Sequence, residues 1–325
     1  MRFLSFLMVL LTTFCLVPDA RAGSVLERIK ARGFIRCGSV ERPGLAHINT
    51  RGRYSGLNVD ICRAIAAAVL GSPDRIEYHA YKEPKDFDAV RSGQDDVYFL
   101  TGAEINEQKL AGKVLTGPTV FVESHAAMVP SNSSALHLGD LAGAGICFLI
   151  GSPEERSLEA YFDGVKKIWI RRAFSEESEM VDAYNAQNCR AIAGEATTLA
   201  LIRLRPGDKE ISSRILPEPL AAFPVMAATG TEDAQWSAIV AWMVHALVSA
   251  ERPETRWYAG GTRAMPIAAS ELGLDKDWQH RVLAAVGNYG DIFERNLGKN
   301  SQLKLERGLN ANQLNGGVLL SPFIE

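Results

Sequence analysis

The side chains that could perform chemistry are scattered along the chain. Its six histidines stand at positions 47, 79, 125, 137, 245 and 280, and only His47 falls in a predicted binding loop. The sequence lacks the H-E-x-x-H, G-x-S-x-G and P-loop patterns that bring together metal ligands, a nucleophile or a phosphate cradle. These spacings therefore predict neither an enzyme nor a bound cofactor or metal.

The first 22 residues predict a secretory signal peptide. Arg2 is the only charge before an apolar run from Phe3 to Val17, and Ala20-Arg21-Ala22 then predicts cleavage after Ala22. The run is shorter than the about 20 apolar residues that a membrane span needs. Without residues 1–22 the chain has 33 basic and 37 acidic residues, a net charge of −4, and no basic cluster that would predict nucleic-acid binding. We therefore expect an exported protein in an oxidising compartment.

Four cysteines lie beyond this segment, and an even number in an exported chain indicates disulfides. They are Cys37, Cys62, Cys147 and Cys189. Four cysteines allow three pairings, and their order favours Cys37–Cys62 and Cys147–Cys189 because each pair closes a local loop within one half of the chain. Zinc is the competing interpretation, but the chain has no C-x-x-C and no paired histidine spacing.

The helices and strands predicted from the sequence form two α/β lobes in series. A chain of 325 residues is long enough for two domains. Alternating helices and strands predict a parallel sheet in each lobe. In the first half we expect strands at 34–40, 76–81 and 97–100, with helices at 24–33, 61–70 and 86–91. In the second half we expect strands at 144–150, 168–170 and 191–193, with helices at 154–161, 176–185 and 197–204. Two further helices are expected at 233–250 and 278–297.

Several blocks of the chain resemble one family. R-Y-S-G-L-N-V-D at 53–60, before an Ala-rich helix, is similar to that family's G-x-Y-S-G-L-x-V-D turn, and 87–97 resembles its R-F-x-A-L-x-S-G-x-x-D-V segment. Residues 286–298 and 307–310 resemble the closing region of the general L-amino-acid binding subgroup, whose four cysteines also match. The chain thus resembles a periplasmic solute-binding protein of the polar amino-acid ABC transporters.

The resemblance implies a type II periplasmic-binding-protein fold, in which two crossing strands join two α/β lobes around a ligand cleft. It implies one lobe of residues 23–125 plus 220–325 and a second lobe of residues 126–219. Such a protein is not an enzyme and needs no cofactor. As a monomer it binds a small polar solute by hinge closure and delivers it to an ABC transporter permease at the inner membrane.

The resemblance breaks where the family binds the ligand carboxylate. The family's strand after S-G-x-x-D-V ends in an arginine that grips this carboxylate, and the matching residue here is Leu100. Glu195 stands where the family has the aspartate that pairs with the ligand ammonium. Two interpretations stay open: a pocket re-specialised for a solute without a free α-carboxylate, cationic or more apolar, or a carboxylate held by another base such as Arg42.

The candidate ligand-binding residues come from both lobes and combine acidic, basic, aromatic and hydroxyl side chains. They are Glu41, Arg42, His47, Tyr81, Phe99, Leu100, Thr101, Glu104, Ser152 and Glu195. Two other functions stay open on this fold. One is a periplasmic accessory or sensor protein without transport, and the other is a cyclohexadienyl-type dehydratase in which Glu195 acts as the acid.

Overall fold

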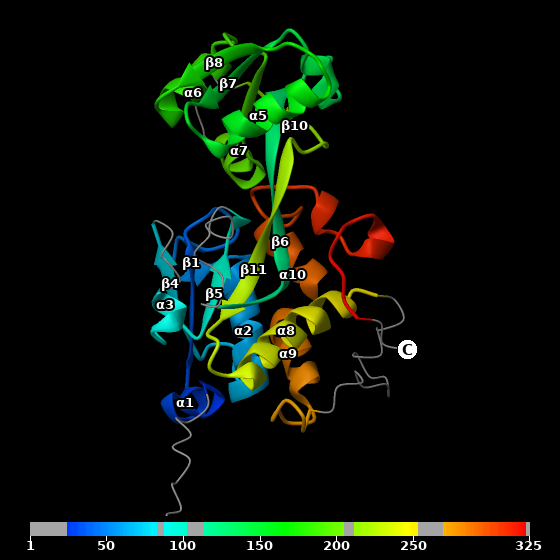
Figure 1. The fold of residues 1–325 in the computed structure, drawn as a ribbon. Helices are drawn as coiled ribbons and strands as arrows, with labels where there is room; N and C mark the ends of the chain where they lie inside the picture. The colour runs from blue at the N-terminus through cyan, green and yellow to red at the C-terminus, as the bar shows by residue number, and fades with distance from the viewer. Residues whose placement is uncertain (1–24, 83–87, 103–113, 205–210, 253–268, 323–325) are drawn as a thin grey trace, which may run out of the picture.

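A computed structural model shows two lobes joined by two long strands, β6 (Leu115–Pro130) and β11 (Ala221–Thr229), which cross between them (Figure 1). The structure describes residues 25–82, 88–102, 114–204, 211–252 and 269–322. The predicted signal peptide and Glu104 lie outside these residues. Within them, no helix is long and apolar enough to cross a membrane.

The lobe at the bottom of Figure 1, called the lower lobe below, contains three parallel strands, as the sequence predicts. Strand β1 (Ile35–Val40) pairs in parallel with both β4 (Ile76–Tyr81) and β5 (Val97–Leu100). Strand β11 runs antiparallel to β5 and β6, so that one sheet continues into the other lobe, where it adds β9 (Ala191–Glu195), β7 (Gly145–Leu149) and β8 (Ile170–Phe174). The strand order is β4-β1-β5-β11-β6-β9-β7-β8. A separate short ribbon joins β2 (His47–Ile48) to β3 (Tyr54–Ser55).

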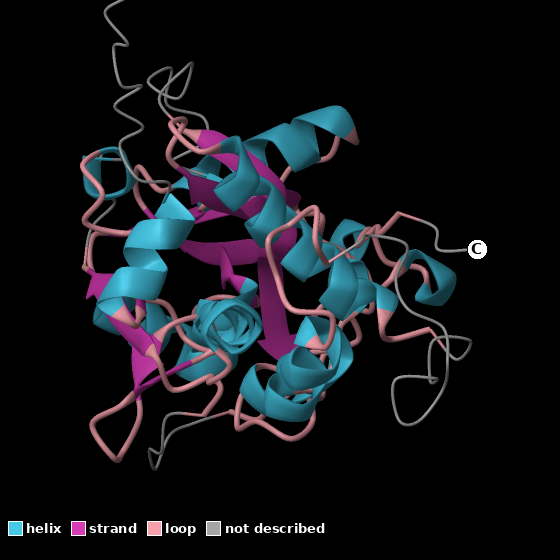
Figure 2. Cartoon of the chain, turned by 90° about the horizontal axis from the view of Figure 1, so that it is seen from below, coloured by secondary structure: helices cyan, strands magenta, loops and turns pink. Residues whose placement is uncertain are grey.

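Helices pack around these strands (Figure 2). Those of the lower lobe are α1 (Val25–Arg32), α2 (Leu57–Leu70), α3 (Asp88–Arg91), α8 (Ala234–Ser249), α9 (Trp278–Val286) and α10 (Tyr289–Asn296). Small side chains let α2 pack closely against α8 and α9, and Ala64, Ala66 and Ala67 are almost fully buried. One predicted helix is two: Gly287, at φ 75°, ends α9, and Asn288 caps α10 through a reciprocal bond with Asp291.

The upper lobe repeats the α/β pattern. Strand β7 (Gly145–Leu149) pairs in parallel with β8 (Ile170–Phe174) and β9 (Ala191–Glu195). Its helices are α5 (Pro153–Gly164), α6 (Glu177–Asn185) and α7 (Ala196–Ile202), and strand β10 (Ser213–Ile215) pairs with β6. Buried apolar residues form separate clusters in the two lobes, apart from contacts of α7 and of Ile215 in β10 with the lower one. This division supports the predicted lobe boundaries, which stay a prediction.

The crossing strands connect the lobes through a single ladder. Strand β6 pairs with β11 over its lower part and with β9 over its upper part, and His125 has a partner on both sides, Ala221 and Glu195. Opposite Val122, β11 has Pro224, which has no N–H to donate. Asn310, from the C-terminal segment, bonds both backbone groups of Val122: its Oδ1 accepts from the Val122 N–H at 2.7 Å and its Nδ2 donates to the Val122 carbonyl at 2.9 Å.

Both predicted disulfides are present. Cys37–Cys62 ties β1 to α2 across 25 residues, and Cys147–Cys189 ties β7 to the turn before β9 across 42 residues. Each bridge closes a loop within one lobe. By loop-closure entropy each stabilises the fold by about 3–4 kcal/mol.

Candidate functional site

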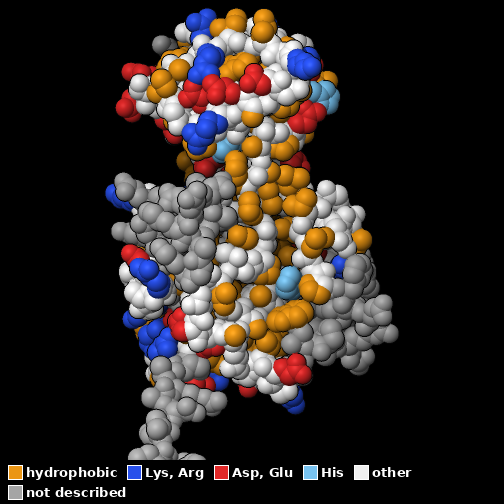
Figure 3. All heavy atoms as spheres, viewed as in Figure 1, with side chains coloured by type: hydrophobic (Ala, Val, Ile, Leu, Met, Phe, Trp, Pro, Cys, Tyr) orange, Lys and Arg blue, Asp and Glu red, His pale blue; other side chains and the backbone are white. Residues whose placement is uncertain are grey.

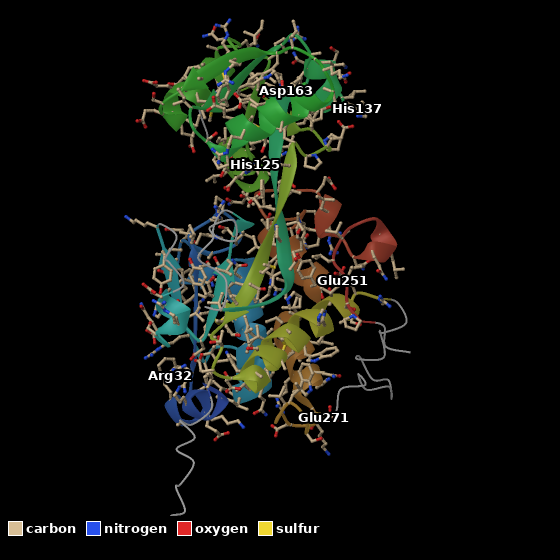
Figure 4. All side chains as sticks on the ribbon, viewed as in Figure 1. Arg32, His125, His137, Asp163, Glu251 and Glu271 are labelled. Atoms are coloured by element: carbon tan, nitrogen blue, oxygen red, sulfur yellow. A yellow bond between two sulfur atoms is a disulfide. The ribbon has the colours of Figure 1, made fainter. Side chains whose placement is uncertain are left out.

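A cavity of about 570 Å³ lies between the lobes, beside the crossing strands. Its walls come from the loop after β1, the end of β5, the first turns of α5, the end of β9, and strands β6 and β11. Figure 4 shows His125 where the crossing strands enter the upper lobe. Apolar side chains cover much of these strands in Figure 3. The volume falls in the range of small-molecule sites, about 300–1,000 Å³.

An ion pair spans the cavity from one lobe to the other. Arg42, in the loop after β1, pairs with the carboxylate of Glu195, the last residue of β9. Their side chains are 20% and 24% exposed. A cation of the lower lobe therefore meets an anion of the upper lobe inside the cavity.

Glu123 supplies a second carboxyl group from the crossing strand β6. It is buried, one of its oxygens accepts a hydrogen bond from the Thr197 hydroxyl at 2.6 Å, and the other accepts from the Ser124 N–H at 3.0 Å. Burial first, and then the nearby charge of Glu195, raise the pKa of Glu123 to about 7. This carboxyl group therefore titrates near neutral pH.

His125 lies two residues further along the same face of β6. Its Nδ1 is 2.8 Å from the Ser157 hydroxyl, which itself donates to the Pro153 carbonyl at 3.2 Å. This pattern assigns the ring proton to Nδ1 and leaves Nε2 as an acceptor. Burial lowers the pKa of His125, so the ring is neutral at pH 7. Its other neighbour is Phe223, with ring centroids 4.6 Å apart.

Three acceptors converge on the upper-lobe side of the cavity. Nε2 of His125 lies 3.4 Å from a carboxylate oxygen of Glu154, and Glu195 offers an oxygen within 4.8 Å of both. In the described part of the chain, this is the set of three side chains whose geometry could hold a cation. An ammonium group has three N–H donors and matches such a set.

A second cation lines the cavity from α5. Arg156 is exposed in the first turns of that helix, among the residues that form the upper wall. It makes no ion pair or hydrogen bond with any described residue. Burial is the main cause that lowers the pKa of His125, and the positive charge of Arg156 adds a smaller contribution in the same direction.

The structure brings together only some of the residues that the sequence predicts. Arg42, Thr101 and Glu195 line the cavity. Glu41 and His47 line a neighbouring cavity of about 610 Å³, which also borders Arg42.

Four of the remaining candidates line neither cavity. Phe99 and Leu100 have no exposed surface, because both are packed inside the sheet. Tyr81 donates to Asp95 at 2.9 Å, and Ser152 caps α5 by accepting from the Glu155 N–H at 3.2 Å. Glu104 lies outside the described residues.

The sequence analysis missed the residues that β6 and α5 contribute. Glu123, Ser124 and His125 are three consecutive polar residues between apolar stretches of β6, and a spacing of two places Glu123 and His125 on one face. This polar interruption of the strand was the available signal. Glu154, Arg156 and Ser157 carry no pattern that separates them from the charged surface of an ordinary helix.

Similar proteins are known for nearly the whole chain. It is 32% identical over 324 residues to the general L-amino acid-binding periplasmic protein AapJ of Rhizobium johnstonii, with 94% of each chain covered. It is 31% identical over 330 residues to the glutamate/glutamine/aspartate/asparagine-binding protein BztA of Rhodobacter capsulatus, covering 94% of this chain and 95% of that one. No family model matches the chain.

A solved structure agrees with these relatives. The ABC transporter periplasmic binding protein from Brucella ovis with glutathione bound has a TM-score of 0.70 and is 28% identical, covering 93% of this chain and 100% of that one. Its type II periplasmic-binding-protein fold matches the two lobes and the crossing strands described above. The chain therefore belongs to the amino-acid-binding periplasmic proteins of ABC transporters, which bind a solute and deliver it to the transporter.

Proposed function

We propose that the cavity between the lobes binds a small zwitterionic solute, an amino acid or an amino-acid-like compound. The observation that carries this proposal is the presence of both signs of charge around one cavity of suitable size. The acceptors of His125, Glu154 and Glu195 fit an ammonium group. The guanidinium groups of Arg42 and Arg156 fit a carboxylate, for which arginine has the matching geometry.

Delivery completes the proposed function. The solute is held when the lobes close about β6 and β11, and the closed form is recognised by an ABC transporter permease at the inner membrane. We include in this proposal export with cleavage after Ala22 and action as a monomer. The relatives are named as binding proteins, which supports binding over the dehydratase or sensor alternatives.

A peptide such as glutathione is a second candidate ligand, favoured by one observation. The Brucella ovis protein, similar over nearly the whole chain, was solved with glutathione bound. Glutathione carries one ammonium group and two carboxylates. The cavity offers three acceptors for the first and two arginines for the others.

Thermal unfolding across a panel of solutes tests the proposal. The panel contains L-amino acids, glutathione, dipeptides, opines and polyamines. A ligand at 100 times its Kd adds about 2.7 kcal/mol to the unfolding free energy, a shift of roughly 5–10 °C for a domain of this size. We expect such a shift with at least one zwitterion. The proposal would be contradicted if no zwitterion raised the unfolding temperature while polyamines alone did.

A further inference from the structure

We infer that Arg156 of α5 is the group that binds the solute carboxylate, so that both charged ends of the solute attach to the upper lobe. This rests on the proposed function, because it assumes a zwitterion in the cavity. A carboxylate taken out of water needs a cation or several hydrogen-bond donors, since burial without them is costly. The described residues that line the cavity include two permanent cations, Arg42 and Arg156.

Arg42 is already engaged. It pairs with Glu195 across the cavity, and both side chains are three-quarters or more buried. Removing one partner from such a pair leaves the other charge poorly solvated. A solute that took Arg42 for its carboxylate would have to compensate Glu195 at the same time.

Arg156 has no such partner among the residues that the structure describes, and the stability of its helix does not explain its position. The positive end of the helix dipole favours acidic residues in the first turn, where Glu154 and Glu155 stand, and disfavours a cation there. Outside the cavity, two glutamates of the same helix have a partner: Glu155 and Glu159 both form ion pairs with Arg171 of β8. Arg156, which lines the cavity, forms no ion pair or hydrogen bond within the described part of the chain.

The arrangement orients the solute along the upper lobe. Its ammonium group lies at the acceptors of His125, Glu154 and Glu195, and its carboxylate lies at Arg156, two residues after Glu154 on α5. The lower lobe then contributes Arg42 and Thr101 on closure. The solute is therefore recognised by the upper lobe of the open protein, before the lobes close.

Matched variants and matched solutes test this assignment. The variants are Arg156→Gln, Arg156→Lys and, as a control of equal charge change, Arg190→Gln, which alters an exposed arginine on the same lobe that lines none of the cavities described above. The probes are L-glutamine, L-glutamate and reduced glutathione, each beside its α-carboxamide or C-terminal carboxamide, measured by calorimetry. Thermal unfolding without solute establishes that each variant is folded.

We expect Arg156→Gln to weaken binding of the free carboxylates by about 10- to 100-fold, the range for a hydrogen bond to a charged group. Binding of the carboxamides should change less than about threefold. Arg156→Lys should fall between, because it keeps the charge but loses the two-pronged contact. Arg190→Gln should match the unmodified protein.

Two results would overturn the inference, and they are distinguishable. If the unmodified protein binds a free carboxylate and folded Arg156→Gln binds it equally well, the carboxylate lies elsewhere while the proposed function stands. If the unmodified protein binds none of the zwitterionic probes and no other zwitterion of the panel, the proposed function fails and this inference fails with it.

Discussion

Replacing Glu123 by glutamine should change how the stability of the protein depends on pH. Glu123 is buried beside Glu195, and its pKa in the folded protein is about 7 against an ordinary 4.5. Below pH 4.5 the carboxyl group is protonated in both the folded and the unfolded chain. Between pH 4.5 and 7 the unfolded chain ionises first, so the unfolding free energy falls as the pH rises.

The size of this fall follows from the shift. A difference of about 2.5 pKa units corresponds to roughly 3 kcal/mol, fully expressed above pH 7. Glutamine cannot ionise and removes this term. It also disturbs the bonds to Thr197 and Ser124, at a cost of about 1–2 kcal/mol that does not depend on pH and cancels between two pH values.

The assay is urea unfolding of the mature protein at pH 5 and pH 8. Relative to the unmodified protein, Glu123→Gln should be more stable at pH 8 than at pH 5 by about 2–3 kcal/mol. Glu179→Gln, an exposed glutamate on α6, is the control and should show no such difference. Parallel pH profiles for Glu123→Gln and the unmodified protein would refute the reasoning, because Glu123 would then ionise as an ordinary carboxyl group.

Three further predictions concern other contacts. Glu195→Gln removes the charge that holds Arg42 across the cavity, so the radius of gyration measured by small-angle X-ray scattering should rise; an unchanged radius would mean that the pair does not hold the lobes together. Glu251→Gln leaves the largely buried guanidinium of Arg307 without its counter-charge and should lower the unfolding free energy by roughly 3 kcal/mol in urea, whereas a change below about 1 kcal/mol would show that water compensates it. Replacing Cys37 and Cys62 together by serine should lower it by about 3–4 kcal/mol, and mass spectrometry of the unmodified exported protein should find no free thiols.

Much of the fold is predictable because its signals are local. The strands β1, β4 and β5 and the Ala-rich helix α2 have clear boundaries in the sequence, and the two disulfides follow from the order of the cysteines. The break at Gly287 was missed because the apolar pattern continues across it, while a glycine with positive φ and the cap at Asn288 divide the helix.

The site is less predictable because its residues meet only in three dimensions. Arg42 and Glu195 are 153 positions apart and form a pair only because the loop after β1 and the end of β9 face each other. The sequence predicts that Leu100, at the end of its strand, is a ligand-binding residue, yet β11 pairs alongside and buries it. The sequence does not show that His125 lies beside Ser157 and Glu154, because those two residues come from α5.

The unbroken strand β6 gives the molecule a particular mechanical character. The two lobes share one hydrogen-bonded ladder. Rotation of one lobe against the other therefore twists β6 over several peptide units and is not concentrated at a single hinge residue. The side chain of Asn310 holds β6 at Val122 through two hydrogen bonds. The C-terminal segment therefore contributes, through Asn310, to the stiffness of this twisting motion. It does so although Asn310 is distant in the sequence from the residues that line the cavity.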